Sequence, residues 1–215
     1  MNEKEILAAE LLSQIRNSLH FLPTSDSSVS NLFLLYLLND IIVNKRRNII
    51  EFGSGISTIY ISKVLSDYNV DANFISIEEN SQWAEIVSQI IDQNKLSFKP
   101  RIILSPLKPS RLALNDLNWY DEQLLSSEIF NYKFDLVVID GPSAWKPGQE
   151  LARFPAIPFL FKNISENVSI FLDDAKREGE QKIQNLWKQT FGYSFDIFND
   201  DFALVQIGTF YNIKF

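Results

Sequence analysis

Short apolar runs alternate with longer amphipathic stretches over most of the chain. Strands are predicted at residues 48–52, 73–77, 101–104, 134–139 and 168–172, and helices at about 57–67, 81–94, 110–130 (irregular), 149–163 and 175–190. This alternation is typical of an α/β sheet whose parallel strands are joined by right-handed crossovers. Two later strands, 193–198 and 202–208, are joined by Asn199, Asp200 and Asp201, a turn composition that suits a hairpin. The sheet is therefore expected to end with an antiparallel strand.

Two helices are predicted before the sheet. The first spans residues 3–19, where apolar side chains recur at helical spacing. The second runs from about Val29 to Val43, with Ser27 or Ser28 as its N-cap. It is apolar nearly all round, so we expect it to be buried against the sheet or against a partner chain. The chain is predicted to be a single domain over residues 1–215, with a helical extension at 1–45 and the sheet core at 46–215.

The composition narrows the class of protein. Hydrophobic residues make up 46% of the chain and include 17 Phe, which is enough for a large core. The chain has no apolar run of about 18 residues, and its N-terminus lacks the basic start of a signal peptide, so a cytoplasmic protein without a membrane segment is expected. The absence of cysteine excludes disulfides, Cys-ligated zinc and thiol catalysis.

Histidine content and charge argue against two further kinds of site. The single histidine, His20, argues against a His-based metal site or a Ser-His-Asp triad. The net charge of −7 argues against nucleic acid as a partner, because nucleic-acid binding depends on basic surface. A small molecule is the expected partner.

The segment NIIEFGSGISTIY, which begins at Asn48, has the pattern of a buried strand, a glycine turn and a helix start. Gly53 and Gly55 bracket a serine, so the backbone can turn sharply and approach a ligand closely. Ser57 and Thr58 can cap the helix that follows. Such a turn is typical of a nucleotide-type site at the end of an α/β sheet, and the simpler alternative is an ordinary strand-to-helix turn.

The spacing of this turn bears on which ligand it holds. A dinucleotide fingerprint requires a third small residue where this chain has Thr58, and a phosphate loop requires a lysine that does not appear before Lys63. What remains is an acidic residue, Glu51, followed by Gly-x-Gly. This pattern resembles motif I of the class I S-adenosylmethionine (SAM)-dependent methyltransferases. The resemblance implies that the loop backbone wraps the methionine part of SAM and that Glu51 lies near its ammonium group.

Glu78 ends the second predicted strand, one helix and one strand after the glycine turn. A carboxylate at this place can accept hydrogen bonds from both hydroxyls of a ribose. The alternative is that Glu78 or Glu79 merely opens the following helix, where acidic residues are favoured. Asn80 or Ser81 can serve as that cap, which leaves Glu78 for the ligand.

Asp140 follows the apolar fourth strand, in the sequence IDGP. Desolvating a carboxylate is costly, so a residue of this kind at a strand end rarely serves packing alone. Asp140 is therefore a candidate base for abstracting a proton or a candidate metal ligand. The structural alternative is an Asx turn formed with Gly141.

The fifth strand ends in two adjacent acids, Asp173 and Asp174. Together with Asp140 they form three carboxylates at neighbouring strand ends, a ligand set that suits Mg²⁺ or another divalent cation. In the alternative, Asp174 caps the last helix while Arg177 or Arg153 pairs with Asp173. The sequence leaves both possibilities open.

The segments EFGSGIST, SIEENSQW, VVIDGP, RFPAIP and FLDDAKREGE together are similar to class I SAM-dependent methyltransferases over about residues 45–208. The resemblance implies a Rossmann-like sheet of seven strands with the last one antiparallel. In the divalent-metal-dependent O-methyltransferases that resemble catechol O-methyltransferase, the ligands are an Asp after strand four and an Asp-Asn pair after strand five. Those places are Asp140, Asp173 and Asp174 here, and Asp174 departs from the family's Asn. The loop Pro142–Gly148, with Trp145, is the expected wall of the acceptor site.

The leading hypothesis is a SAM-dependent methyltransferase that transfers a methyl group to a hydroxyl of a sugar or another small metabolite. The predicted cofactor-binding residues are Glu51, Gly53, Ser54, Gly55, Ser57, Thr58, Glu78 and Asp140. A homo-oligomer formed through the N-terminal helices is also expected. Two alternatives remain: a partner subunit of the same fold that docks through residues 29–43, and an enzyme that binds NAD or a nucleotide sugar.

Overall fold

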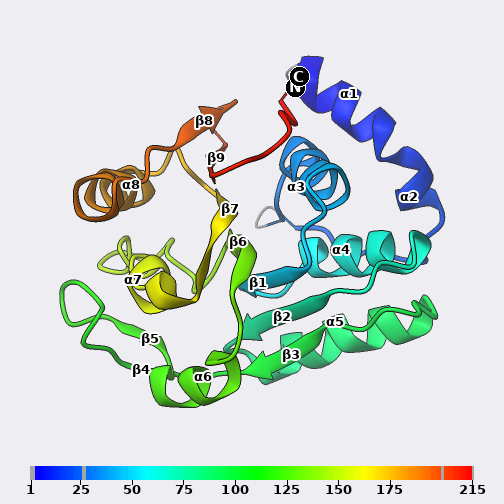
Figure 1. Ribbon diagram of the computed structural model, residues 1–215. Helices are drawn as coiled ribbons and strands as arrows, with labels where there is room; N and C mark the ends of the chain where they lie inside the picture. The colour runs from blue at the N-terminus through cyan, green and yellow to red at the C-terminus, as the bar shows by residue number, and fades with distance from the viewer. Residues whose placement is uncertain (1–2, 26–27, 200, 215) are drawn as a thin grey trace.

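The computed structural model describes residues 3–25, 28–199 and 201–214, and these residues contain one seven-stranded sheet (Figure 1). Its strand order is β3-β2-β1-β6-β7-β9-β8. The strands are β1 (Asn48–Phe52), β2 (Asn73–Glu78), β3 (Arg101–Leu104), β6 (Phe134–Ile139), β7 (Ile164–Leu172), β8 (Asp196–Phe198) and β9 (Phe202–Ile207). β9 is antiparallel to both β7 and β8, whereas the pairs that join β3, β2, β1, β6 and β7 are parallel. This Rossmann-like arrangement confirms the predicted fold class and the antiparallel end of the sheet. Asp200 of the predicted hairpin turn lies outside the described residues.

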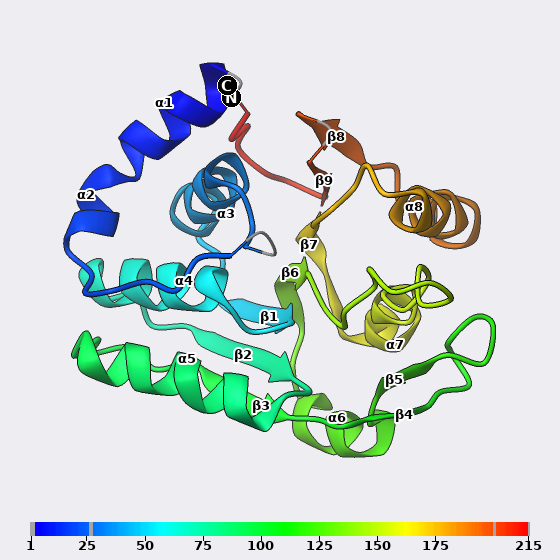
Figure 2. The same cartoon turned by 180° about the vertical axis from the view of Figure 1, so that it is seen from behind.

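Helices cover both faces of the sheet. They are α1 (Glu3–Leu11), α2 (Ser13–Asn17), α3 (Asn31–Val43), α4 (Ile56–Asp67), α5 (Ser81–Gln93), α6 (Glu122–Ile129), α7 (Ala156–Leu160), the 3₁₀ helix η1 (Phe161–Asn163) and α8 (Glu178–Phe191). Figures 1 and 2 show α3, α4 and α5 on one side of the sheet and α6, α7 and α8 on the other. Alternate strand residues feed the two cores: Ile49 packs with α3 and α4, and Ile50 packs with α6, α7 and α8. None of the helices in the described part of the chain is long and apolar enough to cross a membrane.

Three predicted helices differ in the structure. The predicted helix 3–19 is divided into α1 and α2 at Leu12. Within the predicted helix 110–130, only α6 is helical: residues 111–116 form bends and turns, and β5 (Asn118–Tyr120) is a strand that pairs with the preceding β4 (Leu107–Pro109) as a small antiparallel ribbon. Extended backbone in β5 lets Trp119 and Tyr120 both bury their rings against Phe52. Tertiary packing thus overrides the local helical pattern.

The predicted helix 149–163 is the third difference. Only α7 and the short η1 are helical there. Pro155 and Pro158 lie three positions apart, and proline is tolerated only in the first turn of a helix because it lacks a backbone N–H. The helix therefore begins late, at Ala156, and residues 150–155 form turns.

α3 is buried within the chain itself. Its N-cap is Ser30, whose Oγ accepts a hydrogen bond from the Phe33 N–H at 3.1 Å, so the predicted cap at Ser28 is wrong, and Ser27 lies outside the described residues. Nine of its 13 residues are buried, in a core shared with α1, α4 and the sheet. The apolar surface expected to dock a partner subunit is therefore already covered. Association through the N-terminal helices stays a prediction.

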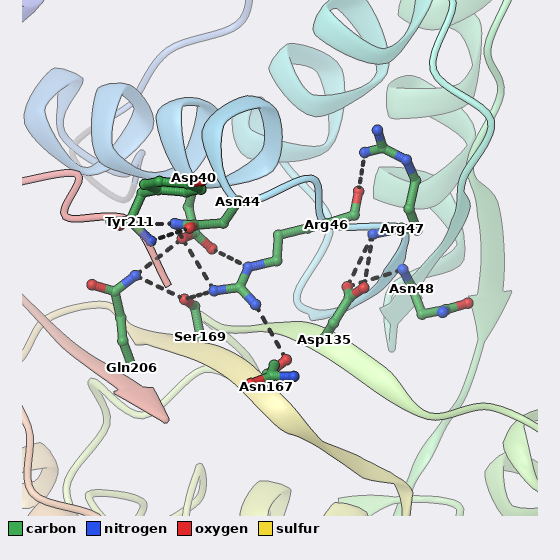
Figure 3. A network of polar contacts seen from close by, with 10 residues as sticks. All are labelled: Asp40, Asn44, Arg46, Arg47, Asn48, Asp135, Asn167, Ser169, Gln206 and Tyr211. Atoms are coloured by element: carbon green, nitrogen blue, oxygen red, sulfur yellow. Dashed lines mark hydrogen bonds and ion pairs between the residues drawn. The ribbon is translucent and has the colours of Figure 1, made fainter. Parts of the chain in front are cut away.

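A buried ion pair between Asp40 and Arg46 attaches α3 to the sheet (Figure 3). Arg46 Nε donates to Asp40 Oδ2 at 2.8 Å, and Arg46 Nη2 donates to Ser169 Oγ on β7 at 2.7 Å. Gln206 of β9 donates to Asp40 Oδ1 at 3.1 Å. Both charged side chains are almost inaccessible, so each depends on the other for compensation of its charge. The network therefore joins α3 to β7 and β9.

Candidate functional site

The glycine turn after β1 lies against the loop after β6. The Gly53 N–H donates to the Ile77 carbonyl at 2.8 Å, and the Gly141 N–H donates to the Phe52 carbonyl at 2.6 Å. Gly53 has a φ of +91°, and a Cβ at this position would lie 2.9 Å from the Gly141 nitrogen. Only glycine combines this backbone conformation with so close an approach. Glycine is therefore needed at position 53, as predicted, because of the positive φ and the closeness of Gly141.

A cavity of about 390 Å³ opens at the carboxyl ends of β1, β2, β6 and β7. The predicted residues that line it are Gly53, Ser54, Gly55, Ser57, Glu78, Asp140 and Asp174. Three other predicted residues, Glu51, Thr58 and Asp173, are buried and do not line it. The structure thus brings most of the predicted site together at the place where open α/β sheets bind ligands.

Glu51 lies behind the cavity wall and supports the glycine turn. Its Oε1 accepts from Ser57 Oγ, and its Oε2 accepts from Thr58 Oγ1 and Ser76 Oγ, each at 2.6 Å. Ser76 is the residue directly opposite Glu51 in the β1–β2 register. Burial raises the pKa of Glu51 to about 7, although the three hydroxyl donors oppose the shift. In this structure Glu51 and Thr58 contact the loop and do not line the cavity, and their role in binding a cofactor stays a prediction.

We expect the buried carboxyl of Glu51 to make stability depend on pH. Its raised pKa means that the folded protein retains a proton that the unfolded chain loses above about pH 4.5, so stability falls as the pH rises towards about 7. This one group accounts for a fall of up to about 3 kcal/mol. In Glu51→Gln, the free energy of unfolding measured by urea titration should decline less between pH 5 and pH 8 than in the wild type. Glu166→Gln, at an exposed site, is the matched control. The same pH dependence in Glu51→Gln and wild type would contradict the assignment.

Glu78 is positioned by backbone groups on both sides. Its Oε2 accepts from the Ser54 N–H at 3.0 Å, and its Oε1 accepts from the Asn80 N–H at 2.8 Å. Asn80 Oδ1 caps α5 by accepting from the N–H groups of Gln82 and Trp83, so Glu78 is not the helix cap. Burial raises the pKa of Glu78 to about 7, and the Asn80 N–H opposes that rise. Glu78 is only 5% exposed, yet it lines the cavity.

Asp140 lies beside a buried arginine. Arg153 Nη2 is 3.1 Å from Asp140 Oδ1 and 3.1 Å from Asp174 Oδ2, and Arg153 Nη1 is 3.5 Å from Glu180 Oε1. Arg153 Nη1 also donates to the Asp173 carbonyl at 3.1 Å. Burial raises the pKa of Asp140, and the guanidinium of Arg153 opposes the rise. A partly buried carboxylate of raised pKa at a cavity wall has the properties of a general base.

The three strand-end carboxylates do converge as predicted. Oxygen atoms of Asp140, Asp173 and Asp174 lie within 4.8 Å of one another. However, Asp140 and Asp174 already share the Arg153 guanidinium, and Asp174 also pairs with Arg177 Nη1 at 2.7 Å. Two of the three carboxylates therefore already have a cationic partner in this structure, and the divalent-cation site stays a prediction. The predicted cap of the last helix by Asp174 is wrong, because the N-cap of α8 is Arg177.

Several lining residues were not predicted from the sequence. Trp83 lines the cavity and donates from Nε1 to the Ser54 carbonyl at 2.7 Å, which fixes the middle of the glycine turn. Pro23 and Val29, from the segment between α2 and α3, close another side. Trp83 belongs to the motif segment SIEENSQW but had no predicted role, whereas Pro23 and Val29 lie outside every motif and reach the strand ends only through chain folding. The predicted acceptor-wall residue Trp145 lines the cavity with 67% of its surface exposed.

No protein-family model and no curated protein matches the amino-acid sequence. Among solved structures, the chain is similar to an O-methyltransferase from Bacillus cereus in complex with S-adenosylhomocysteine (SAH), with TM-score 0.63, 14% identity and coverage of 97% of this chain and 92% of that chain. It is also similar to the SAH-bound Podospora anserina methyltransferase PaMTH1, with TM-score 0.65, 13% identity and coverage of 97% and 89%. A third is the SAM-bound O-methyltransferase TomG from Streptomyces achromogenes, involved in tomaymycin synthesis, with TM-score 0.57, 15% identity and coverage of 97% and 91%. At these identities the similarity concerns the fold.

Proposed function

We propose that this chain, which has the fold of the class I SAM-dependent methyltransferases, is itself such an enzyme and methylates a hydroxyl group of a small-molecule acceptor. The observation that carries the proposal is the cavity at the strand ends. It combines the glycine turn, the buried carboxyl of Glu78 and the carboxyl of Asp140 on one surface. The similar structures with SAM or SAH bound support the donor, and the lining residues support the chemistry.

The proposed donor site uses the glycine turn and Glu78. The turn from Gly53 to Gly55 offers backbone without bulky side chains to the methionine part of SAM. Glu78 is held by the Ser54 and Asn80 N–H groups, one on each oxygen, so its remaining lone pairs are available to two hydroxyls of a ribose. Because the carboxyl is already in place before binding, little side-chain entropy is lost when the ribose arrives.

The proposed reaction is a direct displacement at the methyl carbon of SAM. The acceptor oxygen forms the new O–C bond, the S–C bond breaks, and the sulfur retains the electron pair, which yields SAH. Asp140 accepts the proton that the hydroxyl group loses. The protein otherwise aligns donor and acceptor and limits the access of water. No step is assigned to the divalent cation that the sequence left open, because Arg153 already pairs with Asp140 and Asp174, two of the three candidate ligands.

The proposed acceptor side of the cavity is formed by the loop after β6. Ser143, Ala144 and Trp145 of this loop line the cavity next to Asp140. The exposed indole of Trp145 offers a flat apolar face on which a sugar or an aromatic ring can stack. This exposed aromatic surface supports a ring-bearing metabolite as the acceptor.

A thermal-shift measurement tests the donor. SAH at about 100 times its dissociation constant should stabilise the protein by about 2.7 kcal/mol, because it binds only the folded state. For a chain of this length that corresponds to a rise in melting temperature of about 5 to 10 °C. SAM should act similarly, and NAD at the same concentration should have no effect. Stabilisation by NAD without stabilisation by SAM or SAH would refute the proposed function.

A further inference from the structure

We infer that the guanidinium of Arg153 is the resident cation of the carboxylate cluster at the ends of β6 and β7, and that it takes the place of a divalent ion there. The cluster consists of Asp140, Asp173, Asp174 and Glu180. The inference concerns the site of the proposed function, but it does not depend on which molecule the cavity binds.

The contacts of Arg153 use all three of its nitrogens. Nη2 binds the carboxylates of both Asp140 and Asp174 at 3.1 Å, and Nη1 lies 3.5 Å from Glu180 Oε1 and 3.1 Å from the Asp173 carbonyl. Nε points to the Pro142 carbonyl at 3.5 Å. One planar group therefore connects the ends of two strands, the loop after β6 and the first turn of α8.

The position of this charge is fixed by burial. The Arg153 side chain is only 4% exposed, and Glu180 is almost completely buried. A guanidinium does not lose its proton in proteins, so the positive charge is permanent. Burial opposes the charged form, but the carboxylates of Asp140 and Asp174 raise the pKa of Arg153 above its ordinary value. A buried charge of this kind persists only where its partners compensate it, and the cluster supplies that compensation.

The same position excludes a divalent ion. An ion bound to the two oxygens that Nη2 contacts would lie within about 5 Å of Nη2, because metal–oxygen bonds are about 2 to 2.5 Å long. The two positive charges would repel each other in a site shielded from water. The oxygens that would ligate the ion also already accept hydrogen bonds from Arg153. Removing the guanidinium should therefore open a site that the wild type lacks.

The local sequence explains why an arginine reaches this place. Arg153 lies in the turns that precede α7, where Pro155 delays the helix. Its backbone is therefore not helical, and its side chain reaches the Pro142 carbonyl in the loop after β6 and the Asp173 carbonyl after β7. Glu180 reaches the same group from the first turn of α8.

Titration with Mn²⁺, followed by the electron paramagnetic resonance of the free ion, tests the inference on the full chain without SAM. Wild type is expected to bind no Mn²⁺ up to about 1 mM, the weak end of biological cation sites. Arg153→Ala should gain one site that is at least about tenfold tighter. Arg153→Lys keeps the charge and should remain like the wild type. Circular dichroism and melting of each variant establish that it is folded.

Arg177→Ala is the matched control, because it removes the more exposed arginine that pairs with Asp174 but leaves Arg153 in place. It should not create a Mn²⁺ site. Wild-type binding of one Mn²⁺ below about 1 mM, abolished by Asp174→Asn, would overturn the inference. A folded Arg153→Ala that binds no Mn²⁺ would overturn it as well. If Arg153→Ala does not fold, the wild-type titration and Arg153→Lys decide the question. None of these results bears on SAH binding, so failure here is distinguishable from failure of the proposed function.

Discussion

Replacing Asp140 with asparagine is expected to lower the rate of methyl transfer by about 10²- to 10⁴-fold, the range typical of losing a general base. Asparagine has nearly the same shape but cannot accept the proton of the acceptor hydroxyl. Affinity for SAH should stay within about threefold, because the proposed donor contacts come from the glycine turn and Glu78. The measurement is SAH release across a panel of small hydroxyl-bearing acceptors, paired with calorimetric titration of SAH.

Asp92→Asn is the control for this substitution. Asp92 is an exposed carboxylate on α5 that pairs with Lys99, away from the cavity. The Asp92→Asn variant loses the same charge as Asp140→Asn, and its turnover should match that of the wild type. A fully active Asp140→Asn would remove Asp140 from the mechanism. A variant that loses turnover and SAH binding together would instead place Asp140 in donor binding.

Replacing Glu78 with alanine should weaken SAH binding by about 100-fold. The ribose would lose two hydrogen bonds to a charged acceptor, and a net loss of about 3 kcal/mol corresponds to that factor. The substitution also leaves the Ser54 and Asn80 N–H groups without their present partner, so the glycine turn is held less firmly. Calorimetric titration with SAH measures the affinity.

Glu85→Ala is the matched control, since Glu85 is an exposed acid on α5 and does not line the cavity. It should bind SAH like the wild type. The melting temperature of each variant without ligand separates a local effect on binding from general destabilisation. Unchanged affinity in a folded Glu78→Ala would exclude the ribose-binding role.

The strands were predictable because their signal is local. β1, β3 and β6 have the predicted bounds, and each is a short apolar run delimited by polar or glycine residues. The antiparallel end of the sheet likewise followed from the turn composition between β8 and β9. Segments with conflicting signals were harder to predict. The predicted helix 110–130 is helical only in α6, and its residues Asn118–Tyr120 form a strand in which Trp119 and Tyr120 are buried.

The site was predictable as a set of positions, but not as a set of roles. The glycine turn, Glu78 and Asp140 do meet at one cavity. Glu51 belongs to the same motif, yet its side chain is buried and accepts hydrogen bonds from Ser57 and Thr58 and from Ser76, its partner on β2. A motif specifies which residues are near a turn. The pairing of the strands decides which of the motif side chains line the cavity and which hold the backbone of the turn.

The sequence by itself determined the strands of the main sheet, the need for glycine at the turn and the acids at the strand ends, since these depend on periodicity and backbone conformation within a few residues. Only the tertiary structure decided how the acids are neutralised. Arg153 is 13 residues from Asp140 and 20 from Asp173, in a segment whose pattern predicted a helix. Charge pairing acts through space, and burial strengthens it by excluding water. The guanidinium that compensates the cluster is therefore defined only when β6, β7, α8 and the turns before α7 have come together.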